Sequence, residues 1–501
     1  MTSALAPDGV TRVAIDPRRA LGQVDRRIYG GFVEHLGRCI YGGLYEPGSA
    51  LSDDRGFRAD VLGLLKDLRL SVLRWPGGNF VSNYHWIDGV GPQAGRPVRP
   101  DVAWGGTESN QFGTDEYLQY CAALGAEPYI CLNMGSGSLE EALAWVEYCN
   151  SDRPTYWADQ RRANGHDLPY GVRWWGLGNE IYGDWQVGAM SADEYVAEAT
   201  RWARAIKMID PGARLVSCGQ LGWSDWDVTV IDGLAGLVDL HSIHIYTGSD
   251  DYWSNVLAPH AAERAIATAS TLLRRAAYQQ QLERTPRLVY DEWNVWFRQM
   301  TGALEERYVF HDALAVGLYL NIFVRNSASV AMANMAQMVN AIAPIVTSPQ
   351  AAVVQPIYYP FLLHAQGHLG TAVDAYVTGP TVESPAELKT RWPYPIADLG
   401  PFPLVDVAAT VDQDRRRLAV TLVNRSEQPG QVRLSLRDGT LTGPARLRCL
   451  TGTGKPAQAA GITGVEGSEL AAGTVDPHGG ELVLELPDRS FTLVEADIAT
   501  S

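Results

Sequence analysis

The chain has 501 residues, of which 46% are hydrophobic and 20% charged, a balance that is ordinary for a soluble globular protein of about three domains. Aspartate and glutamate outnumber lysine and arginine by 57 to 41, and the net charge of −16 argues against a nucleic-acid partner or an anionic membrane surface. The six cysteines are scattered without a C-x-x-C pair, which argues against a disulfide framework and against a zinc site.

The start of the chain lacks the basic and apolar regions of a secretion signal. No run of about 20 apolar residues is free of charge, so we expect no membrane-spanning segment. The sequence therefore predicts a cytoplasmic protein with no membrane partner.

Between about residues 28 and 340, short apolar runs rich in β-branched and aromatic residues alternate with helical stretches. Ser138 and Ser191 each begin a Ser-x-x-Glu capping box, and the helix after Ser191 is expected to stop at Asp210. Eight β-α repeats predict an α/β fold, a (β/α)8 TIM barrel. An open doubly wound sheet is the alternative, disfavoured because no glycine-rich phosphate fingerprint follows the first strand. The predicted strands are Ile28–Leu36, Ser71–Gly78, Glu127–Gly135, Arg173–Glu180, Arg214–Gly219, Val238–Tyr246, Arg287–Trp293 and Ser329–Met338.

A long connection follows the second predicted strand, from Pro76 to about Gly113. Loops of this length on a compact fold are usually functional or disordered. The aromatic content of this one favours a place at the rim of an active site.

After about residue 375 the pattern changes to strand-like alternation between turn signals, without a helix of useful length. This predicts a C-terminal antiparallel β-sandwich, jelly-roll-like, over residues 376–501. The run Val10–Ile15 is expected to add a strand, so that residues 1–20 belong to the sandwich and residues 21–375 form the catalytic barrel. The predicted C-terminal strands are Leu418–Asn424, Gln431–Leu436, Ala445–Leu450, Glu481–Leu486 and Ser490–Glu495.

Two glutamates end predicted strands on one rim of the barrel. The fourth strand ends in Asn179-Glu180, and the seventh, three β-α units later, ends in Asp291-Glu292. Active sites of such barrels lie at the carboxyl ends of the strands. Glycoside hydrolysis needs two carboxyls there, one to protonate the leaving oxygen and one to attack the anomeric carbon or activate water. The pair predicts a glycosidase, although either residue alone could be a surface or helix-capping glutamate.

The other predicted strand ends are also polar and offer donors and acceptors for a hydroxyl-rich ligand, with a satisfied core residue as the alternative for each. Tryptophan and tyrosine number 15 and 22 against 10 phenylalanines, which also favours sugar rings. His35 and His244 could bind a metal, but they lie on separate strands without a third histidine, so we predict no metal or other cofactor. The polar residues are Glu34, His35, Arg74, Asn79, Asn133, His241, His244, Tyr246, Asn334, Gln337 and Asn340.

Six motifs occur in order along the chain. They are Phe32-Val-Glu-His-Leu-Gly37, Arg74-Trp-Pro-Gly-Gly-Asn-Phe80, Gly106-Thr-Glu-Ser-Asn-Gln-Phe-Gly113, Gly176-Leu-Gly-Asn-Glu180, His244-Ile-Tyr246 and Asp291-Glu-Trp-Asn-Val-Trp296. Together they resemble glycoside hydrolase family 51, whose best-known members are α-L-arabinofuranosidases. Asn-Glu alone is shared by many barrel glycosidases, but the six motifs in this order are specific. The resemblance covers nearly the whole chain.

The resemblance implies a retaining, exo-acting enzyme that removes terminal α-L-arabinofuranosyl residues from arabinan or arabinoxylan oligosaccharides. It implies Glu180 as the general acid/base and Glu292 as the nucleophile. Family members commonly form hexamers and many bacterial ones are intracellular, so the resemblance implies a homohexamer. It also implies that Glu34, Asn79, Asn179, Tyr246 and Gln337 hold the sugar hydroxyls, that Arg74 supports them, and that Trp296 shapes the site.

These roles set electrostatic requirements. Glu180 must be protonated near neutral pH, so we expect burial or the nearby carboxylate to raise its pKa. Glu292 must stay ionised, which donors such as Arg74 and Tyr246 would favour. An endo-glucanase or β-xylosidase on the same scaffold is one alternative. A closed pocket would favour exo cleavage, and an open groove would favour endo cleavage. A non-catalytic carbohydrate-binding protein is another, and the presence of both glutamates argues against it.

Overall fold

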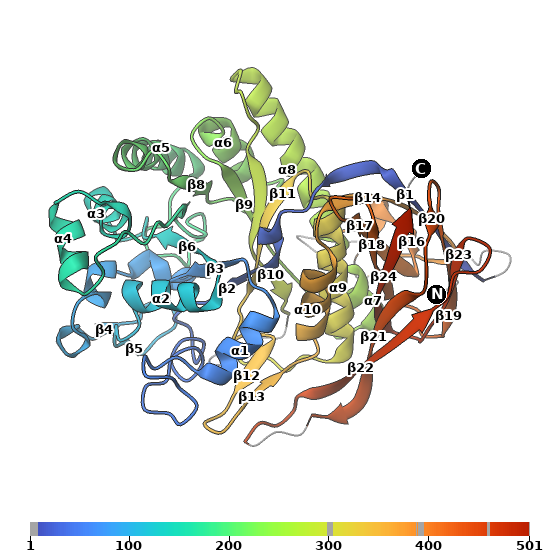
Figure 1. The fold of residues 1–501 in the computed structure, drawn as a ribbon. Helices are drawn as coiled ribbons and strands as arrows, with labels where there is room; N and C mark the ends of the chain where they lie inside the picture. Colours follow the sequence, from blue (N-terminus) through green and yellow to red (C-terminus); the bar gives the residue numbers. More distant parts are fainter. Residues whose placement is uncertain (1–8, 298–303, 387, 389–394, 458–460, 500–501) are drawn as a thin grey trace.

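The computed structural model describes residues 9–297, 304–386, 388, 395–457 and 461–499. Eight parallel strands close in the order β10-β11-β2-β3-β6-β7-β8-β9, which confirms the predicted TIM barrel (Figure 1). The barrel strands are β2 (Gly30–Phe32), β3 (Val72–Trp75), β6 (Glu127–Leu132), β7 (Trp174–Leu177), β8 (Arg214–Ser217), β9 (Leu240–Thr247), β10 (Arg287–Val295) and β11 (Val330–Ala336).

The predicted helix starts are present, with one difference. Ser191 caps its helix with the full box, because its side chain accepts the N–H of Glu194 while the Glu194 carboxylate accepts the N–H of Ser191. Ser138 also accepts the N–H of Glu141, but the Glu141 carboxylate lies against His85 instead. Within the described residues no helix is both long and apolar enough to cross a membrane. The helices are α1 (Ala59–Asp67), α2 (Thr114–Leu124), α3 (Leu139–Asn150), α4 (Tyr156–Ala163), α5 (Ala192–Ile209), α6 (Asp225–Leu234), α7 (Tyr252–Leu257), α8 (His260–Gln279), α9 (Phe310–Arg325) and α10 (Tyr358–Gly367).

The inside of the barrel changes from apolar to polar along its strands. Near the strand starts, one apolar cluster is built from Val72, Tyr129, Trp174, Val216, Leu240, Val289, Ala331 and Met332. Side chains two residues apart on a strand share a face. Arg74 therefore follows Val72 on the inner face of β3, and His244 and Tyr246 follow Leu240 on that of β9. The polar ends leave a place for an active site at the carboxyl rim.

The first barrel strand is shorter than predicted. The sequence predicts Ile28–Leu36, whereas β2 is preceded by a 3-10 turn over Arg26–Tyr29. Asp25 caps this turn by accepting the backbone N–H of Arg27 at 3.1 Å. Beyond β2 the chain leaves the ladder and brings Glu34 to the barrel mouth.

A second sheet forms the predicted β-sandwich, in the order β22-β21-β24-β18-β17-β14-β1-β19-β23 with β20 paired to β24. The N-terminal run is present as β1, and the five predicted C-terminal strands are present as β18, β19, β21, β23 and β24. The pair β1–β19 is parallel, unlike the predicted antiparallel arrangement. Parallel neighbours need a long crossover, and here the barrel lies between them in the chain. The strands are β1 (Thr11–Gln23), β14 (Thr371–Thr378), β17 (Val405–Val411), β18 (Arg417–Asn424), β19 (Gly430–Leu436), β20 (Thr440–Leu441), β21 (Ala445–Pro456), β22 (Glu466–Val475), β23 (Glu481–Leu486) and β24 (Ser490–Ala499).

The predicted domain boundaries stay a prediction. In the sandwich sheet, β1 extends to Gln23 and β14 begins at Thr371, so both strands overlap the predicted barrel range by a few residues. Residues 1–8 of the predicted N-terminal segment lie outside the described residues. Short strand pairs in the loops are β4 (Arg99–Pro100) with β5 (Thr107–Glu108), β12 (Ile345–Thr347) with β13 (Ala352–Val354), and β15 (Thr381–Val382) with β16 (Phe402–Pro403).

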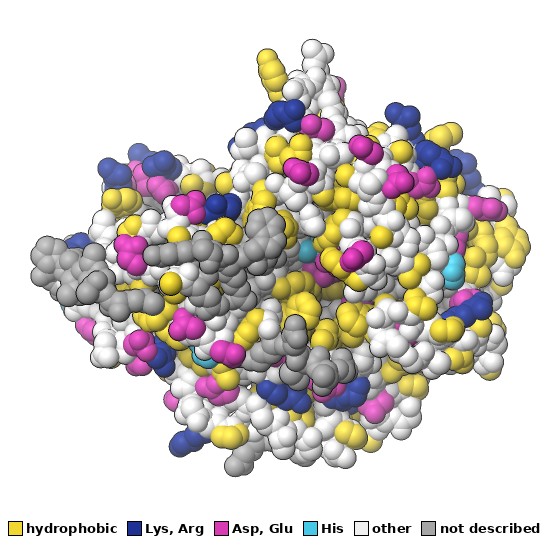
Figure 2. Space-filling view, turned by 180° about the vertical axis from the view of Figure 1, so that it is seen from behind, with side chains coloured by type: hydrophobic (Ala, Val, Ile, Leu, Met, Phe, Trp, Pro, Cys, Tyr) yellow, Lys and Arg dark blue, Asp and Glu magenta, His cyan; other side chains and the backbone are white. Residues whose placement is uncertain are grey.

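One face of the molecule carries charged side chains of both signs. Figure 2 shows lysines and arginines interspersed with aspartates and glutamates on one face, and among the described residues of that face the basic side chains do not gather into one patch. A nucleic-acid backbone would require such a patch.

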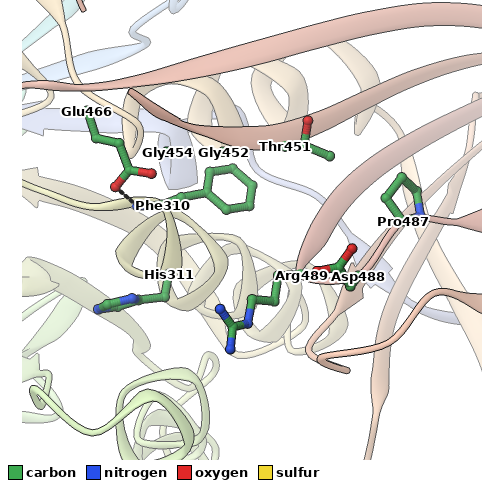
Figure 3. Close-up of a pocket in the computed structure, with 9 residues that line it drawn as sticks. All are labelled: Phe310, His311, Thr451, Gly452, Gly454, Glu466, Pro487, Asp488 and Arg489. Carbon is green, nitrogen blue, oxygen red and sulfur yellow. Dashed lines mark hydrogen bonds between the residues drawn. The ribbon is translucent and has the colours of Figure 1, made fainter. Parts of the chain in front are cut away.

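Helices α9 and α10 lie between the barrel and the sandwich (Figure 1). Asp406 of β17 accepts hydrogen bonds from Asn321 and Arg325 of α9, both at 2.7 Å. A cavity of about 310 Å³ remains where the start of α9 meets β21 and β22, and there Glu466 accepts the N–H of Phe310 at 3.0 Å (Figure 3). Polar contacts therefore fix the sandwich on α9.

Candidate active site

A pocket of about 390 Å³ opens at the carboxyl ends of the barrel strands. Arg74 and Asn179, each 1% exposed, lie beneath its lining, and Arg74 donates hydrogen bonds both to Glu292 of the lining and to Asn179. All nine predicted site residues therefore meet at one place. Those that line the pocket directly are Glu34, Asn79, Glu180, Tyr246, Glu292, Trp296 and Gln337.

Glu292, on β10, has one donor on each carboxylate oxygen. Nη1 of Arg74 donates to Oε1 at 2.8 Å, and the hydroxyl of Tyr246 donates to Oε2 at 2.8 Å. Arg74 is held over the ring of Phe32 at 4.4 Å. An arginine is always charged, so this contact stabilises the ionised carboxylate.

Glu180 follows β7 and is surrounded by donors. Its Oε1 lies 2.9 Å from Nδ1 of His244, and its Oε2 accepts from Nε1 of Trp185 at 3.2 Å. Burial alone would raise the pKa of Glu180, but the hydrogen bond and positive charge of His244 outweigh it and the pKa is lowered. The expected rise is wrong for the free site, because a cation lies beside the carboxylate.

That cation is His244. Burial lowers the pKa of His244, whereas the charges of Glu292 and Asp291 and the hydrogen bonds raise it, to about 10. The ring is therefore an imidazolium at neutral pH. Its Nδ1 donates to Glu180, and its Nε2 donates to Oδ1 of Asp291 at 3.0 Å.

The same groups have the spacing of a metal site but not its chemistry. One ring nitrogen of His244 and one carboxylate oxygen from each of Glu180 and Glu292 lie within 4.8 Å of one another, which by distance alone could hold an ion. A metal needs a nitrogen lone pair, and a doubly protonated ring has none. The chemistry of the donors therefore fits an ion-paired cluster better than a metal site.

Glu34, which also lines the pocket, accepts three hydrogen bonds. They come from the N–H of Phe80 and Nε1 of Trp104, both at 3.0 Å, and from Nε2 of Gln337 at 2.7 Å. Burial, followed by the charge of Glu292, raises the pKa of Glu34 to about 7 despite these donors. Glu34 therefore changes charge near neutral pH.

Two asparagine amides turn their oxygens towards the protein. Oδ1 of Asn179 accepts from Nη2 of Arg74 at 2.6 Å, and Oδ1 of Asn79 accepts from Nε2 of Gln186. Nδ2 of Asn179 is buried and has no partner among the described residues. Each amide thus keeps its NH2 group as a donor for a ligand hydroxyl.

Several residues of the site were missed by the sequence analysis. Trp104 lies between β4 and β5 on the predicted rim loop, where the aromatic content was the signal that could have found it. Trp185 and Gln186 follow Glu180 without a distinguishing pattern. The lining is completed by Gly78 and by the apolar side chains of Leu36, Leu304 and Ile342, which carry no chemical signal.

Other polar strand-end residues do not line the pocket and have hydrogen-bond partners elsewhere, although Oδ1 of Asn334 is buried without one among the described residues. His35 is paired with Glu108, and His241 lies between Ser217 and Asp227. For these residues the satisfied-core interpretation holds. The asparagines donate to backbone carbonyls, Asn133 to Tyr84, Asn334 to Gly31 and Asn340 to Arg38.

Two family models cover most of the chain. Residues 64–263 match the α-L-arabinofuranosidase 1 domain, and residues 291–490 match the α-L-arabinofuranosidase C-terminal domain. Among curated relatives, α-L-arabinofuranosidase C of Emericella nidulans is 42% identical, with 96% of each chain covered. The intracellular exo-α-(1→5)-L-arabinofuranosidase 1 of Bacillus subtilis is 36% identical, over 85% of this chain and 87% of its own.

Solved structures agree with these matches. The α-L-arabinofuranosidase of Thermotoga maritima in its arabinose complex is 37% identical, with a TM-score of 0.86 over 97% of this chain and 100% of its own. The thermostable family 51 enzyme of Thermotoga petrophila is 37% identical, with a TM-score of 0.88 over 97% and 99%. Identity, coverage and fold together place this glycoside hydrolase among the α-L-arabinofuranosidases of glycoside hydrolase family 51.

Proposed function

We propose that the enzyme is a retaining, exo-acting α-L-arabinofuranosidase that releases terminal non-reducing arabinofuranosyl residues from arabinan or arabinoxylan oligosaccharides. Glu292 is the nucleophile and Glu180 the general acid/base. The observation that carries this proposal is the approach of the two carboxylates, which have oxygens within 4.8 Å of each other. Retaining enzymes hold their carboxyls about 5–5.5 Å apart, whereas inverting enzymes need about 6.5–9.5 Å for a water.

The reaction proceeds by two displacements. A carboxylate oxygen of Glu292 attacks the anomeric carbon while Glu180 gives a proton to the glycosidic oxygen, so the C–O bond breaks and an alcohol leaves. Glu180, now a carboxylate, removes a proton from water. The resulting oxygen nucleophile displaces Glu292 and restores the starting configuration.

The surrounding side chains suit a small polyhydroxylated ring. We assign the sugar hydroxyls to Glu34, Asn79, Asn179, Tyr246 and Gln337. Arg74 supports them by holding Glu292 and Asn179, and Trp296 packs edge-on against Tyr246 with ring centroids 5.3 Å apart. The exo mode is supported by the limited pocket volume of about 390 Å³ and by the name of the Bacillus relative.

The product of the first turnovers tests the mechanism. Proton NMR of 4-nitrophenyl α-L-arabinofuranoside hydrolysis should show the α-anomer of arabinofuranose first. Initial β-anomer would contradict retention. A linear arabino-oligosaccharide should lose one arabinose at a time, and mid-sized fragments at early times would indicate endo cleavage. Turnover of a β-xyloside or a glucan without turnover of the arabinofuranoside would reassign the substrate.

We also propose a cytoplasmic location and a homohexameric assembly. The location is supported by the name of the Bacillus subtilis relative, which is described as intracellular. The assembly is supported by the family resemblance. Fractionation of the native host and light scattering of the purified enzyme test the two statements separately.

A further inference from the structure

Gln186 lies on the loop that follows Glu180, where it is buried and does not line the pocket. The side chain is 6% exposed. Its Oε1 accepts from the hydroxyl of Ser82 at 2.7 Å, and its Nε2 donates to Oδ1 of Asn79. Both ends of the amide are therefore engaged within the protein, and one of them holds a residue that lines the pocket.

This contact decides what Asn79 offers to a ligand. An asparagine amide presents either an acceptor oxygen or an NH2 donor, and the group bound at one end selects the group left at the other. Because Gln186 occupies Oδ1, Nδ2 of Asn79 remains for the pocket. Ser82 donates to the oxygen of Gln186, which leaves the NH2 group of Gln186 to face Asn79.

The three loops involved are packed too closely to move independently. A Cβ on Gly135, after β6, would lie 2.3 Å from the carbonyl oxygen of Ser82 and 2.4 Å from that of Val187. The N–H of Ser136 also donates to the carbonyl of Ser82 at 2.9 Å. The backbone around Gln186 is thus held against the loop that carries Asn79.

The same loop holds the proposed acid/base. Trp185, next to Gln186 in the chain, donates its Nε1 to Oε2 of Glu180. Two neighbouring residues therefore reach different parts of the pocket, one to the proton-transfer group and one to the sugar-binding amide.

We propose that Gln186 is a positioning residue, which together with Ser82 fixes the amide of Asn79 so that its NH2 group donates to one hydroxyl of the bound sugar. The inference rests on the proposed function in taking that sugar to be an arabinofuranosyl group. It adds a coupling between sugar recognition and the loop of the acid/base.

The test compares Gln186→Leu, Asn79→Ala and the double variant. Trp104, Trp185 and Trp296 line the pocket, so intrinsic fluorescence can follow the binding of L-arabinose without turnover. Each single variant should weaken binding about tenfold, the loss expected for one hydrogen bond. The double variant should bind no more weakly than Asn79→Ala, because both changes remove the same donor.

Monodeoxy substrates identify the hydroxyl. With 4-nitrophenyl α-L-arabinofuranoside, Gln186→Leu should lower kcat/KM about tenfold, whereas for one monodeoxy analogue the variant and the wild type should be equal. A merely structural role would lower kcat/KM for every analogue alike.

Gln186→Glu gives a signature that a loss of packing cannot mimic. An ionised carboxylate only accepts hydrogen bonds, so it should turn Nδ2 of Asn79 away from the pocket. When protonated, the same side chain can donate to Oδ1 of Asn79. Relative to the wild type at the same pH, binding of L-arabinose should therefore recover as the pH falls in this variant, and not in Gln186→Leu.

Asn424→Ala is the matched control, since it removes another buried amide, 1% exposed and bonded to the carbonyl of Pro487 in the sandwich. Its L-arabinose binding should equal that of the wild type. Additive losses in the double variant, equal losses on all monodeoxy substrates, or unchanged binding in Gln186→Leu would overturn the proposal. If the wild type inverts configuration or cleaves endo, the proposed function fails, but the arabinose titration still judges Gln186.

Discussion

His244 is a buried cation among three carboxylates, and its proton governs the charge of the whole cluster. Burial would raise the pKa of Asp291, but Arg74 and His244 lower it, so Asp291 is ionised. The His244–Glu180 pair holds one proton, which in the free site lies on the ring. The acid role proposed for Glu180 requires that proton on its carboxylate. The 2.9 Å hydrogen bond between Nδ1 of His244 and Oε1 of Glu180 is the route by which the proton is transferred.

Removing the two proposed catalytic carboxylates should have different effects. Glu292→Ala should lower kcat by about four orders of magnitude or more on every substrate, because no covalent intermediate can form. Glu180→Ala should lower it about 10²–10⁴-fold on oligosaccharides, and far less on a dinitrophenyl arabinofuranoside whose leaving group needs no proton. The comparison requires kcat for both substrate types. Equal losses on both would count against Glu180 as the acid/base.

Glu34 should make sugar affinity depend on pH near neutrality. Its pKa is raised to about 7, and three protein donors leave the carboxylate about one acceptor site for a sugar hydroxyl. Above that pKa the hydroxyl meets an anion, and such hydrogen bonds are roughly twice as strong as neutral ones. L-Arabinose affinity should therefore rise as the pH passes through 7, and Glu34→Gln should remove that transition. A transition of the same midpoint in Glu34→Gln would assign it to another group.

At the residue scale, the sequence predicts positions better than charges. Glu180 and Glu292 could be found because carboxyl ends of parallel strands meet at one rim. The charge of His244 could not be found, because it depends on the register of β9 against the neighbouring strand β10, which brings Glu292 and Asp291 to the ring.

Two glycines touch within the rim loop between β3 and α2. A Cβ on Gly113, at the end of this loop, would lie 1.9 Å from the carbonyl oxygen of Gly89, so the two backbones are in contact on either side of residues 90–112. Trp104 is carried between them and forms a wall of the pocket. The close approach of two glycines thus positions a side chain of the site.

Gly113→Ala should separate these backbones. We expect the free energy of unfolding to fall by about 2 kcal/mol, as for an overpacked core position, and KM to rise because Trp104 moves from Glu34. Gly95→Ala lies in the same loop, where a Cβ meets nothing within 4 Å, and should change the free energy of unfolding by less than about 0.5 kcal/mol. Urea unfolding and steady-state kinetics of both variants check this. Equal stability of the two would show that the glycine contact is dispensable.

At the element scale, the sequence predicts strands where alternation and turns are clear. β18, β19 and β23 follow their predicted ranges closely. β17 is buried along its whole length and so lacks the alternation that marks a half-exposed strand, while β22 is mostly exposed and has no apolar face to detect. The late start of β2 depends on a turn capped by Asp25, which competes locally with strand pairing.

At the scale of the whole molecule, two buried histidines lie where the barrel and the sandwich meet. His364 belongs to α10, and His368 directly follows this helix. The rings of His364 and His368 lie 4.8 Å apart, and His364 faces the ring of Phe491 of β24 at 5.6 Å. The ring nitrogens of His368 lie 3.0 Å from the hydroxyl of Thr410 and 2.9 Å from that of Thr421, on β17 and β18. A neutral histidine pair is therefore part of the junction that joins the two parts of the chain.

Acid should weaken this junction. Burial lowers the pKa of His368 to about 3, and burial together with the nearness of His368 lowers the pKa of His364 well below 6.5. Below about pH 6.5 both histidines bind protons in the unfolded chain but stay neutral in the folded chain. The contribution of the two neutral rings to the free energy of unfolding, present above pH 6.5, is therefore lost as the pH falls towards 3. Each histidine should contribute a slope of about 1.4 kcal/mol per pH unit in that window.

His364→Phe keeps an aromatic ring against Phe491 but removes one proton-binding site. The free energy of urea unfolding, measured between pH 4 and 6.5, should therefore fall less steeply with decreasing pH than in the wild type, by about 1.4 kcal/mol per pH unit. His478 is exposed, so His478→Gln should leave the slope unchanged. If His364→Phe lowers stability equally at every pH, the ring acts through packing alone. A slope unchanged in both His364→Phe and His368→Asn would place the acid sensitivity of the enzyme outside this junction.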